Sequence, residues 1–289
     1  MSENKITFLI QCHDSKGIIS KVTTFFYEEG FNILSCQQFT DNIQESYFMR
    51  ISLDAQDLKY SRKELIFKFA EVADALNLQW RVHFTSDKEN VAVLASKTTH
   101  CLFDILEKHG EGKLQCNIPL IISNHESLKY VADQFGIPFH YLPIDSENWI
   151  AQQEKILNLM TEYQIDLIVM ARFMRILSSE FISAYQEKII NIHHAFLPAF
   201  QGANPYRRAY ERGVKMIGAT AHYATDDLDE GPIIEQDVER VSHASTPASL
   251  AQIGSDIERK VLSKAVKYHL DHRIIVTGNR TIVFPETED

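Results

Sequence analysis

The sequence is poor in cysteine, has no excess of positive charge and contains no long apolar run, and each shortage excludes a class of protein. Its four cysteines (Cys12, Cys36, Cys101 and Cys116) lack the spacing of metal or redox motifs, so we expect reduced thiols rather than a disulfide framework. The net charge of −10 argues against a nucleic-acid partner, because such binding needs a basic face. No apolar run approaches membrane length, so we expect no membrane partner either.

The apolar fraction of the sequence is high enough for two domains. A chain of 289 residues with 45% apolar residues can bury more than one core. The first residues, Met1 to Lys5, are too polar for a secretory signal peptide. We therefore expect a soluble cytoplasmic α/β protein, with one domain at residues 1–85, a polar linker at 86–90 and a second domain at 91–289.

The first domain is predicted to have the element order βαββαβ, which is that of the ferredoxin-like fold. A helix follows the turn at Asp14 to Gly17 and ends at Gly30, and a second helix places Leu65 and Phe69 on one face. Strands are expected at residues 5–12, 31–39, 45–53 and 78–84.

A spaced set of residues in this domain matches a known pattern: Asp14, Gly17, Ile18, Val22, Phe26, Gly30, Asn32 and Ile33. With this set the domain resembles the ACT family of small regulatory domains. The resemblance implies pairing between subunits, and exposed sheet edges favour a homo-oligomer, either dimer or tetramer. It also implies an amino-acid effector site, for which Asp14, Gly17 and Asn32 are the candidates and methionine or glycine the suggested effectors.

The second domain is predicted to be a mostly parallel, Rossmann-like sheet covered by helices on both faces, because apolar strands alternate there with amphipathic helices. Ligands bind such sheets beyond the carboxyl ends of the strands, where Ser96, Asn124, Arg172 and His193 are expected. A late helix that begins at Thr246-Pro247 and a hairpin turning at residues 278–279 are interpreted as structural. The strands are expected at residues 91–96, 118–123, 139–142, 166–171 and 188–193.

Asn191, His193 and Asp229 are the candidate catalytic residues. Asn191 and His193 are two positions apart, so they project from the same face of an extended strand, and Asp229 lies in a polar loop that could fold back to them. An amide that stabilises an oxyanion, a histidine that moves protons and a carboxylate that orients the histidine suit acyl chemistry. Alternatively, the strand end and the acidic turn only satisfy backbone groups.

A metal site at His193, His194, His222 and Asp229 is the other possibility for this region. The adjacent histidines would point to opposite faces of a strand, and no His-x-x-x-His or Cys-x-x-Cys motif brackets them. We therefore expect no metal.

The second domain carries ordered motifs at residues 121–125, 170–178, 191–198, 202–206, 218–223 and 231–232. With these motifs it resembles the folate-dependent formyltransferase family, and within that family the branch in which water replaces the amine acceptor. The resemblance implies that Asn191, His193 and Asp229 form the catalytic group. It also implies hydrolysis of 10-formyltetrahydrofolate to tetrahydrofolate and formate, which would supply purine synthesis and balance one-carbon pools. The folate is then the substrate, and no cofactor is needed.

The resemblance also suggests substrate-binding and secondary residues. Met174, Arg175, Ile176 and Leu177, together with Asp226, match the segments that hold the pterin ring, largely through backbone atoms. His222 matches a neighbouring site histidine, although a packing role fits it as well, and His194 fits the water-accepting branch. One position departs from the family pattern, since that branch usually has a serine where this chain has Ala195.

The segment Ser96 to Cys101 bears on the identity of the acceptor. Transferases that formylate a phosphorylated ribonucleotide have a glycine-rich turn there, whose amides receive the phosphate. This chain has no glycine in the segment, and side chains on every residue would crowd a phosphate. Loss of that cradle favours water as the acceptor, although Lys97, beside Ser96, could still bind an anion.

Two alternatives remain at this stage. One is a formyltransferase with an unidentified amine acceptor, such as a sugar amine; a charged tRNA fits poorly with the acidic chain. The other is an amino-acid sensor whose second domain binds folate without turnover. The presence of Asn191, His193 and Asp229 together favours an enzyme.

Overall fold

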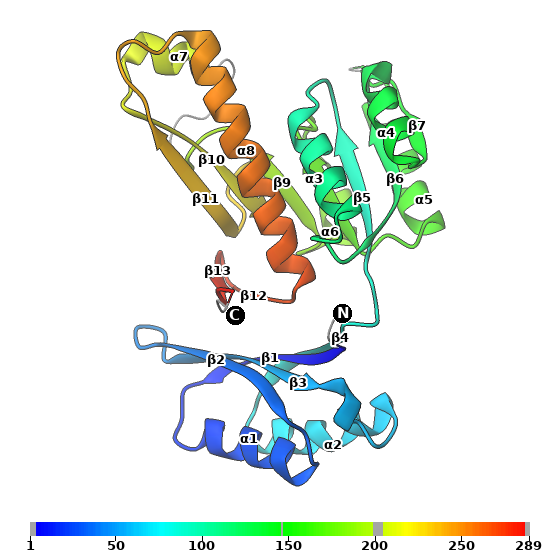
Figure 1. Ribbon diagram of the computed structural model, residues 1–289, viewed down its shortest axis with the longest axis vertical. Helices are drawn as coiled ribbons and strands as arrows, with labels where there is room; N and C mark the ends of the chain where they lie inside the picture. The colour runs from blue at the N-terminus through cyan, green and yellow to red at the C-terminus, as the bar shows by residue number, and fades with distance from the viewer. Residues whose placement is uncertain (1–3, 146, 199–204, 287–289) are drawn as a thin grey trace. The chain divides into compact units, whose positions relative to one another are not determined.

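The computed structural model describes residues 4–145, 147–198 and 205–286 of the chain. By their contacts these residues form two units (Figure 1). The first unit contains the chain up to Lys88, residues 272–275 and the segment from Ile282 onward, and the second contains Glu89–Asp271 and Val276–Thr281. No helix among the described residues is long and apolar enough to cross a membrane.

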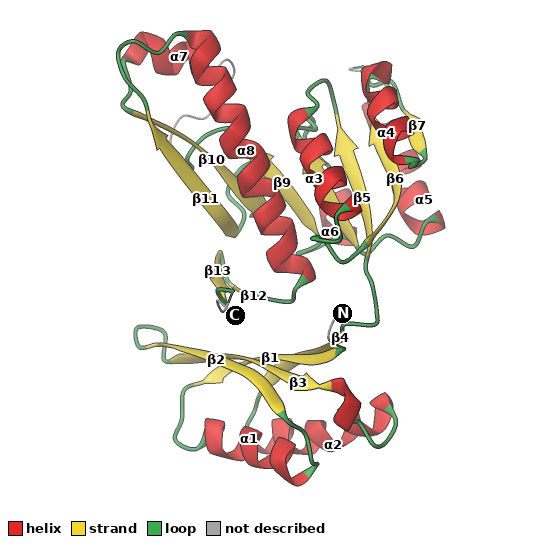
Figure 2. Ribbon diagram, viewed as in Figure 1, coloured by secondary structure: helices red, strands yellow, loops and turns green. Residues whose placement is uncertain are grey.

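The first unit is a four-stranded antiparallel sheet in the order β2-β3-β1-β4, with two helices on one face (Figure 2). The predicted ferredoxin-like order is confirmed. Its elements are β1 (Lys5–His13), α1 (Ile18–Glu28), β2 (Ile33–Asp41), β3 (Ser46–Asp54), the 3₁₀ helix η1 (Ala55–Asp57), α2 (Arg62–Ala75) and β4 (Gln79–Phe84).

Aromatic rings fill the space between this sheet and its helices. Phe8 of β1, Phe26 of α1 and Phe69 of α2 are fully buried, and their ring centroids lie 4.7 to 5.5 Å apart. The helices begin where the sequence permits it: Gly17 has a φ of 94° ahead of α1, and the Ser61 side chain caps α2 by accepting from the backbone of Glu64. The core of the first unit is therefore an aromatic cluster between the sheet and its two helices.

The opposite face of the same sheet packs against the C-terminal segment of the chain. Leu9 and Phe48 form a small cluster there with Ile275 and Phe284, and Arg50 Nε donates to the backbone oxygen of His272 at 2.9 Å. The sequence analysis assigned the whole segment after residue 91 to the second domain. Strands β1 and β3 are apolar at successive positions, so both of their faces need cover, and the C-terminal segment covers the second face.

The second unit is a seven-stranded sheet in the order β11-β10-β9-β8-β5-β6-β7. The five strands from β9 to β7 are parallel, which confirms the predicted mostly parallel fold, and β10 and β11 add antiparallel neighbours that the sequence analysis did not identify. The strands are β5 (Asn90–Ala95), β6 (Asn117–Ser123), β7 (Phe139–Tyr141), β8 (Leu167–Ala171), β9 (Ile189–His193), β10 (Met216–Tyr223) and β11 (Ile233–Arg240).

Helices cover this sheet, and the longest of them, α8, packs against α3, β9, β10 and β11. Thr246 caps α8 in a capping box with Ser249, and Pro247 is its first residue, as predicted from the sequence. A two-stranded hairpin follows α8. The helices are α3 (His100–Gly110), η2 (Glu126–Leu128), α4 (Lys129–Phe135), α5 (Trp149–Glu162), α6 (Ser179–Ala184), α7 (Pro205–Arg212) and α8 (Pro247–Leu270), and the hairpin strands are β12 (Ile274–Thr277) and β13 (Arg280–Val283).

The aromatic core of the first unit makes a stability prediction. Phe69→Ala should lower the free energy of unfolding of this unit by ~3–5 kcal/mol, because it removes a fully buried ring. Phe67→Ala is the matched control on the same helix: its ring is 69% exposed, and its loss should change stability by no more than about 0.5 kcal/mol. Urea unfolding followed by circular dichroism measures both, and equal effects would contradict the assignment of the core.

Candidate active site

The pairing of β9 with β10 brings the first three site residues together. Asn191 and His193 alternate along β9 and so share one face. The antiparallel register places His222 of β10 directly opposite Asn191. Asn191, His193 and His222 therefore form a cross-strand cluster at the carboxyl end of β9. In parallel sheets, ligands bind beyond this end of the strands.

Asp229 reaches this cluster from the loop between β10 and β11. Its φ is 59°, in the left-handed region that non-glycine residues rarely adopt. Close by, Gly231 packs so tightly that an added Cβ would lie 1.8 Å from the Tyr223 backbone oxygen. The loop thus folds back onto β10, and an Asp229 carboxylate oxygen comes within 3.1 Å of His193 Nδ1.

Opposing electrostatic effects act on the Asp229 carboxyl. Burial raises its pKa, but the hydrogen bond from His193 and the attraction of the neighbouring histidines outweigh burial, so the pKa lies below its ordinary value. Asp229 is therefore a carboxylate at neutral pH. It fixes His193 through Nδ1 and leaves Nε2 as the ring atom that can act on a bound molecule.

His222 orients the amide of Asn191. Its Nδ1–H donates to the Tyr223 backbone oxygen at 3.0 Å, so Nε2 is the acceptor for the Asn191 side-chain amide at 3.2 Å. Burial lowers the pKa of His222, and the hydrogen bond to Tyr223 offsets this only in part. A neutral His222 thus accepts a hydrogen bond from one of the two Asn191 amide N–H groups, and the other N–H can donate to a ligand.

His193 and His194 are both buried, and their rings stack with centroids 4.9 Å apart. The buried Nε2 of His193 has no hydrogen-bond partner among the described residues. A buried polar atom of this kind is normally paired, so its position favours a molecule bound in front of it.

A pocket of about 640 Å³ lies in front of these residues. It gathers most of the candidate site residues into one cavity. Its lining includes Asn191, His193, His194, His222 and Asp229, and the predicted folate-binding residues Met174, Arg175, Ile176, Leu177 and Asp226.

The loop after β8, which lines the pocket, is held in place by two hydrogen bonds. Trp149 of α5 donates through Nε1 to the Ile176 backbone oxygen at 2.9 Å, and Arg175 Nη2 donates to the Ile144 oxygen at 3.1 Å. The Met174 and Ile176 side chains remain more than half exposed. An apolar rim above fixed backbone groups suits a flat heterocycle.

Other candidate residues lie apart from this pocket. Ser96 is buried and donates to Asn124 at 2.7 Å, Lys97 is exposed, and neither lines the pocket. Of the motif at residues 202–206, positions 202–204 lie outside the described residues, whereas Tyr206 lines the pocket.

The candidate effector residues are only partly brought together in the first unit. Asp14 and Gly17 line an open hollow of about 670 Å³ beside β2. Asn32 is exposed and does not line it; its backbone N–H donates instead to Asp57 at 2.8 Å.

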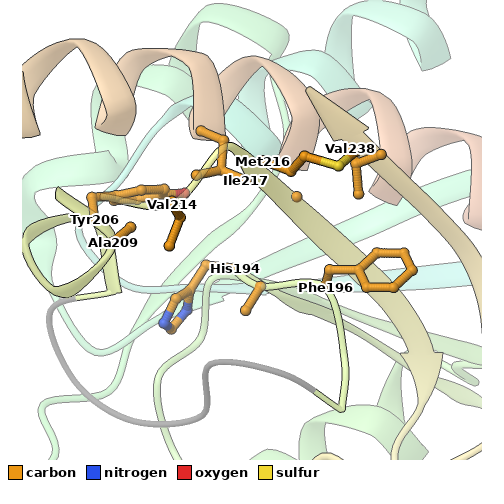
Figure 3. Close-up of a pocket in the computed structure, with 10 residues that line it drawn as sticks. His194, Phe196, Tyr206, Ala209, Val214, Met216, Ile217 and Val238 are labelled. Carbon is orange, nitrogen blue, oxygen red and sulfur yellow. The ribbon is translucent and has the colours of Figure 1, made fainter. Parts of the chain in front are cut away.

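A second, apolar cavity of about 230 Å³ shares His194 and Tyr206 with the catalytic pocket (Figure 3). Ala195, where the water-accepting branch usually has serine, lines this cavity and not the catalytic pocket. A serine hydroxyl at this position would therefore border the apolar cavity.

A buried polar cluster around Glu258 of α8 was not predicted from the sequence. Glu258 contacts His100, Arg172 and Tyr206, and Arg172 and Tyr206 line the catalytic pocket. One feature of the sequence could have revealed the cluster: Glu258 is a charged residue on the apolar stripe of α8, beside Ile257. The ligand atoms of His100, Cys101 and Glu258 lie within 4.8 Å of one another, as in a metal site, but the Arg172 cation beside Glu258 favours an ion pair instead.

Comparison with known families matches both units. The model described as formyl transferase matches residues 89–266, and the model described as ACT domain matches residues 6–65. Formyltetrahydrofolate deformylase from Synechocystis sp. is 50% identical over 278 residues, 96% of this chain and 98% of that protein. The same-named protein from Bacillus subtilis is 45% identical over 284 residues, 98% of this chain and 95% of that protein.

Solved structures give the same pattern. A formyltetrahydrofolate deformylase from Pseudomonas syringae pv. tomato superposes with a TM-score of 0.96 at 36% identity, covering 99% of this chain and 96% of that one. A glycinamide ribonucleotide transformylase from Symbiobacterium toebii superposes with a TM-score of 0.65 at 27% identity, covering 70% of this chain and 97% of that one. The full-length likeness is thus to deformylases, and the likeness to the transformylase covers only part of the chain.

The hydrogen bonds of His222 predict its protonation state. At about pH 6 a smaller fraction of this ring should be charged than of a histidine with the ordinary pKa of about 6.5, and the neutral ring should carry its proton on Nδ1. Nitrogen-15 NMR of histidine-labelled protein distinguishes these forms, and His222→Gln identifies the signal by its loss. A charged ring, or a proton on Nε2, would show that His222 does not accept from Asn191.

Proposed function

The chain belongs to the formyl transferase family, among its formyltetrahydrofolate deformylases, and we propose that it hydrolyses 10-formyltetrahydrofolate to tetrahydrofolate and formate. The observation that carries this function is the convergence of Asn191, His193 and Asp229 in one pocket beside the loop 173–177. We propose that the two units have separate roles: the second unit performs the reaction, and the first unit, which contains the ACT domain, regulates or assembles the enzyme.

Attack by water begins the reaction. The water oxygen bonds to the formyl carbon, and negative charge develops on the formyl oxygen. Asn191 donates to this oxyanion through the amide N–H that His222 does not use, and His193, acting as an imidazolium with both ring nitrogens protonated, donates to it through Nε2. One such donor contributes about 2.7–4 kcal/mol to the transition state, so these two residues account for a large part of the rate.

Asp229 moves the proton that completes the reaction. The attacking water gives up a proton to the Asp229 carboxylate, which passes it to N10 as the bond between the formyl carbon and N10 breaks. Tetrahydrofolate leaves with a neutral N10–H, and formic acid loses its remaining proton to solvent as formate. The low pKa of Asp229 keeps it ionised for each cycle.

The pterin ring binds against the loop from Phe173 to Leu177, whose backbone groups are fixed by α5 and by Arg175. Asp226 lies in the loop on the other wall of the pocket. The pterin is therefore the part of the substrate that the pocket recognises, and the reaction needs no organic cofactor.

The hollow beside Asp14 and Gly17 is the proposed effector site of the first unit. It opens at the start of α1, where the positive end of the helix dipole suits an amino-acid carboxylate, and Gln38 and Thr40 of β2 supply polar groups. Methionine and glycine are the proposed effectors, acting in a homo-oligomer.

The hydrolytic function predicts formate without any amine. The purified chain, kept anaerobic with 10-formyltetrahydrofolate, should release tetrahydrofolate and formate in equal amounts. Asp229→Asn should abolish nearly all turnover while keeping folate binding, because it removes the proton carrier. Asp227→Asn is the matched control, since Asp227 is exposed and does not line the pocket. Formate release by Asp229→Asn at the parent rate would contradict the assigned role.

The effector proposal predicts a response to amino acids. Millimolar methionine or glycine should change the rate of formate release or the mass measured by light scattering, and Asp14→Ala should remove that response. Asp74→Ala, an exposed change on α2 away from the hollow, should preserve it. If neither amino acid changes rate or mass, the unit has no effector role of this kind.

A further inference from the structure

Glu258 is the centre of a buried cluster that the hydrolytic mechanism above does not use. Its side chain is 2% exposed, one carboxylate oxygen lies 2.7 Å from His100 Nε2 and 3.5 Å from Arg172 Nε, and the other accepts from the Tyr206 hydroxyl at 2.6 Å. Three different segments of the second unit therefore meet at one carboxylate.

The charges of this cluster are balanced internally. Burial raises the pKa of Glu258, but the hydrogen bonds from His100 and Tyr206 and the charge of Arg172 outweigh it, so the pKa lies below its ordinary value. Burial raises the pKa of Tyr206, whose hydroxyl stays neutral. Arg172 Nε and Nη1 are buried with no hydrogen-bond partner among the described residues, so the ion pair with Glu258 holds the guanidinium.

Two backbone features accommodate the cluster. Arg172 has a φ of 63°, a conformation that glycine adopts without strain and arginine does not. Gly254 of α8 lies so close to Tyr206 that an added Cβ would be 2.0 Å from the hydroxyl. The strained backbone of Arg172 and the requirement for glycine at position 254 both serve this cluster. They indicate a specific arrangement rather than incidental packing.

The position of the cluster connects it to the choice of acceptor. Arg172 and Tyr206 line the catalytic pocket together with His193 and His194. His100 comes from the segment 96–101, which corresponds in the resemblance above to the phosphate-binding turn of the transferases. Arg172 and Tyr206 thus line the pocket and are connected to that segment through Glu258, which also contacts His100.

We propose that the Arg172–Glu258 pair, completed by His100 and Tyr206, is the specificity-determining element that excludes amine acceptors and leaves water to attack. This inference rests on the proposed hydrolysis. An amine needs room for the groups attached to its nitrogen, and the cluster fills the wall through which they would extend. Water has no such groups and is unaffected.

The excluded reaction can be written out and measured. In transfer, the amine nitrogen bonds to the formyl carbon, the bond from that carbon to N10 breaks, and a proton from the amine passes through Asp229 to N10. The product is a formamide, and no formate is released. The ratio of formamide to formate therefore reports acceptor choice independently of the total rate.

The double variant Arg172→Gly with Glu258→Gln opens the wall without leaving a buried charge unpaired. Glycine suits the backbone at position 172, and glutamine retains groups that pair with His100 and Tyr206. With glycinamide as the amine, the ratio of N-formylglycinamide to formate, measured by mass spectrometry, should rise roughly tenfold or more over the parent. Glu258→Gln alone removes the ion pair but keeps the guanidinium, so it should raise the ratio by less than the double variant does.

The outcomes are distinguishable. A double variant that hydrolyses with the parent ratio would overturn the exclusion role, and so would one that binds folate but performs neither reaction. If the double variant does not fold, Arg172→Asn combined with Glu258→Gln replaces it, because asparagine tolerates the left-handed backbone, and the same rise in ratio is required. If the parent makes no formate without an amine, the proposed function itself has failed.

Discussion

The antiparallel pairing of β9 with β10 is the constraint on which the rest of the catalytic site depends. It sets His222 opposite Asn191, and that contact fixes which way the Asn191 amide points. It also sends the chain into the loop that returns Asp229 to His193. A slip of one residue in this register would move His222 to the other face of the sheet and leave the amide unoriented. The catalytic group therefore lies where the parallel part of the sheet, which ends at β9, meets its first antiparallel neighbour, β10.

Two carboxylates of the second unit stay ionised although they are largely or wholly buried, and each does so with a different partner. Asp229 depends on His193, while the neighbouring His222 is kept neutral by burial. Glu258 depends on His100, Arg172 and Tyr206. The first carboxylate lines the catalytic pocket, whereas the second does not line it and instead contacts the lining residues Arg172 and Tyr206. This difference suits Asp229 to chemistry and Glu258 to the shape of the pocket wall, although both are acids on the same sheet-and-helix framework.

The sequence predicted those features that local patterns encode. Continuous apolar runs identified the parallel strands, and the two-residue spacing placed Asn191 and His193 on one face. It did not reveal β10 and β11 as antiparallel neighbours, nor the contact of His222 with Asn191, because pairing register is a long-range property that no local period contains. Glu258 was overlooked for a related reason. Within α8 it is one acid beside an apolar stripe, and its partners come from segments 52 to 158 residues away.

The backbone itself shows how far the pocket is preorganised. Arg172 and Asp229 both have positive φ, and such a conformation costs about 1–3 kcal/mol for a residue with a side chain. Each is retained because its side chain is committed to a partner in the interior, Arg172 to Glu258 and Asp229 to His193. The ion pairs and the strained backbone are therefore mutually dependent: without the pair the loop would relax, and without the loop the pair could not form. Charges that are held in place before the substrate binds need no reorganisation during the reaction. The strained backbone at Asp229 is thus coupled to catalysis, and the strained backbone at Arg172 is coupled to the choice of acceptor.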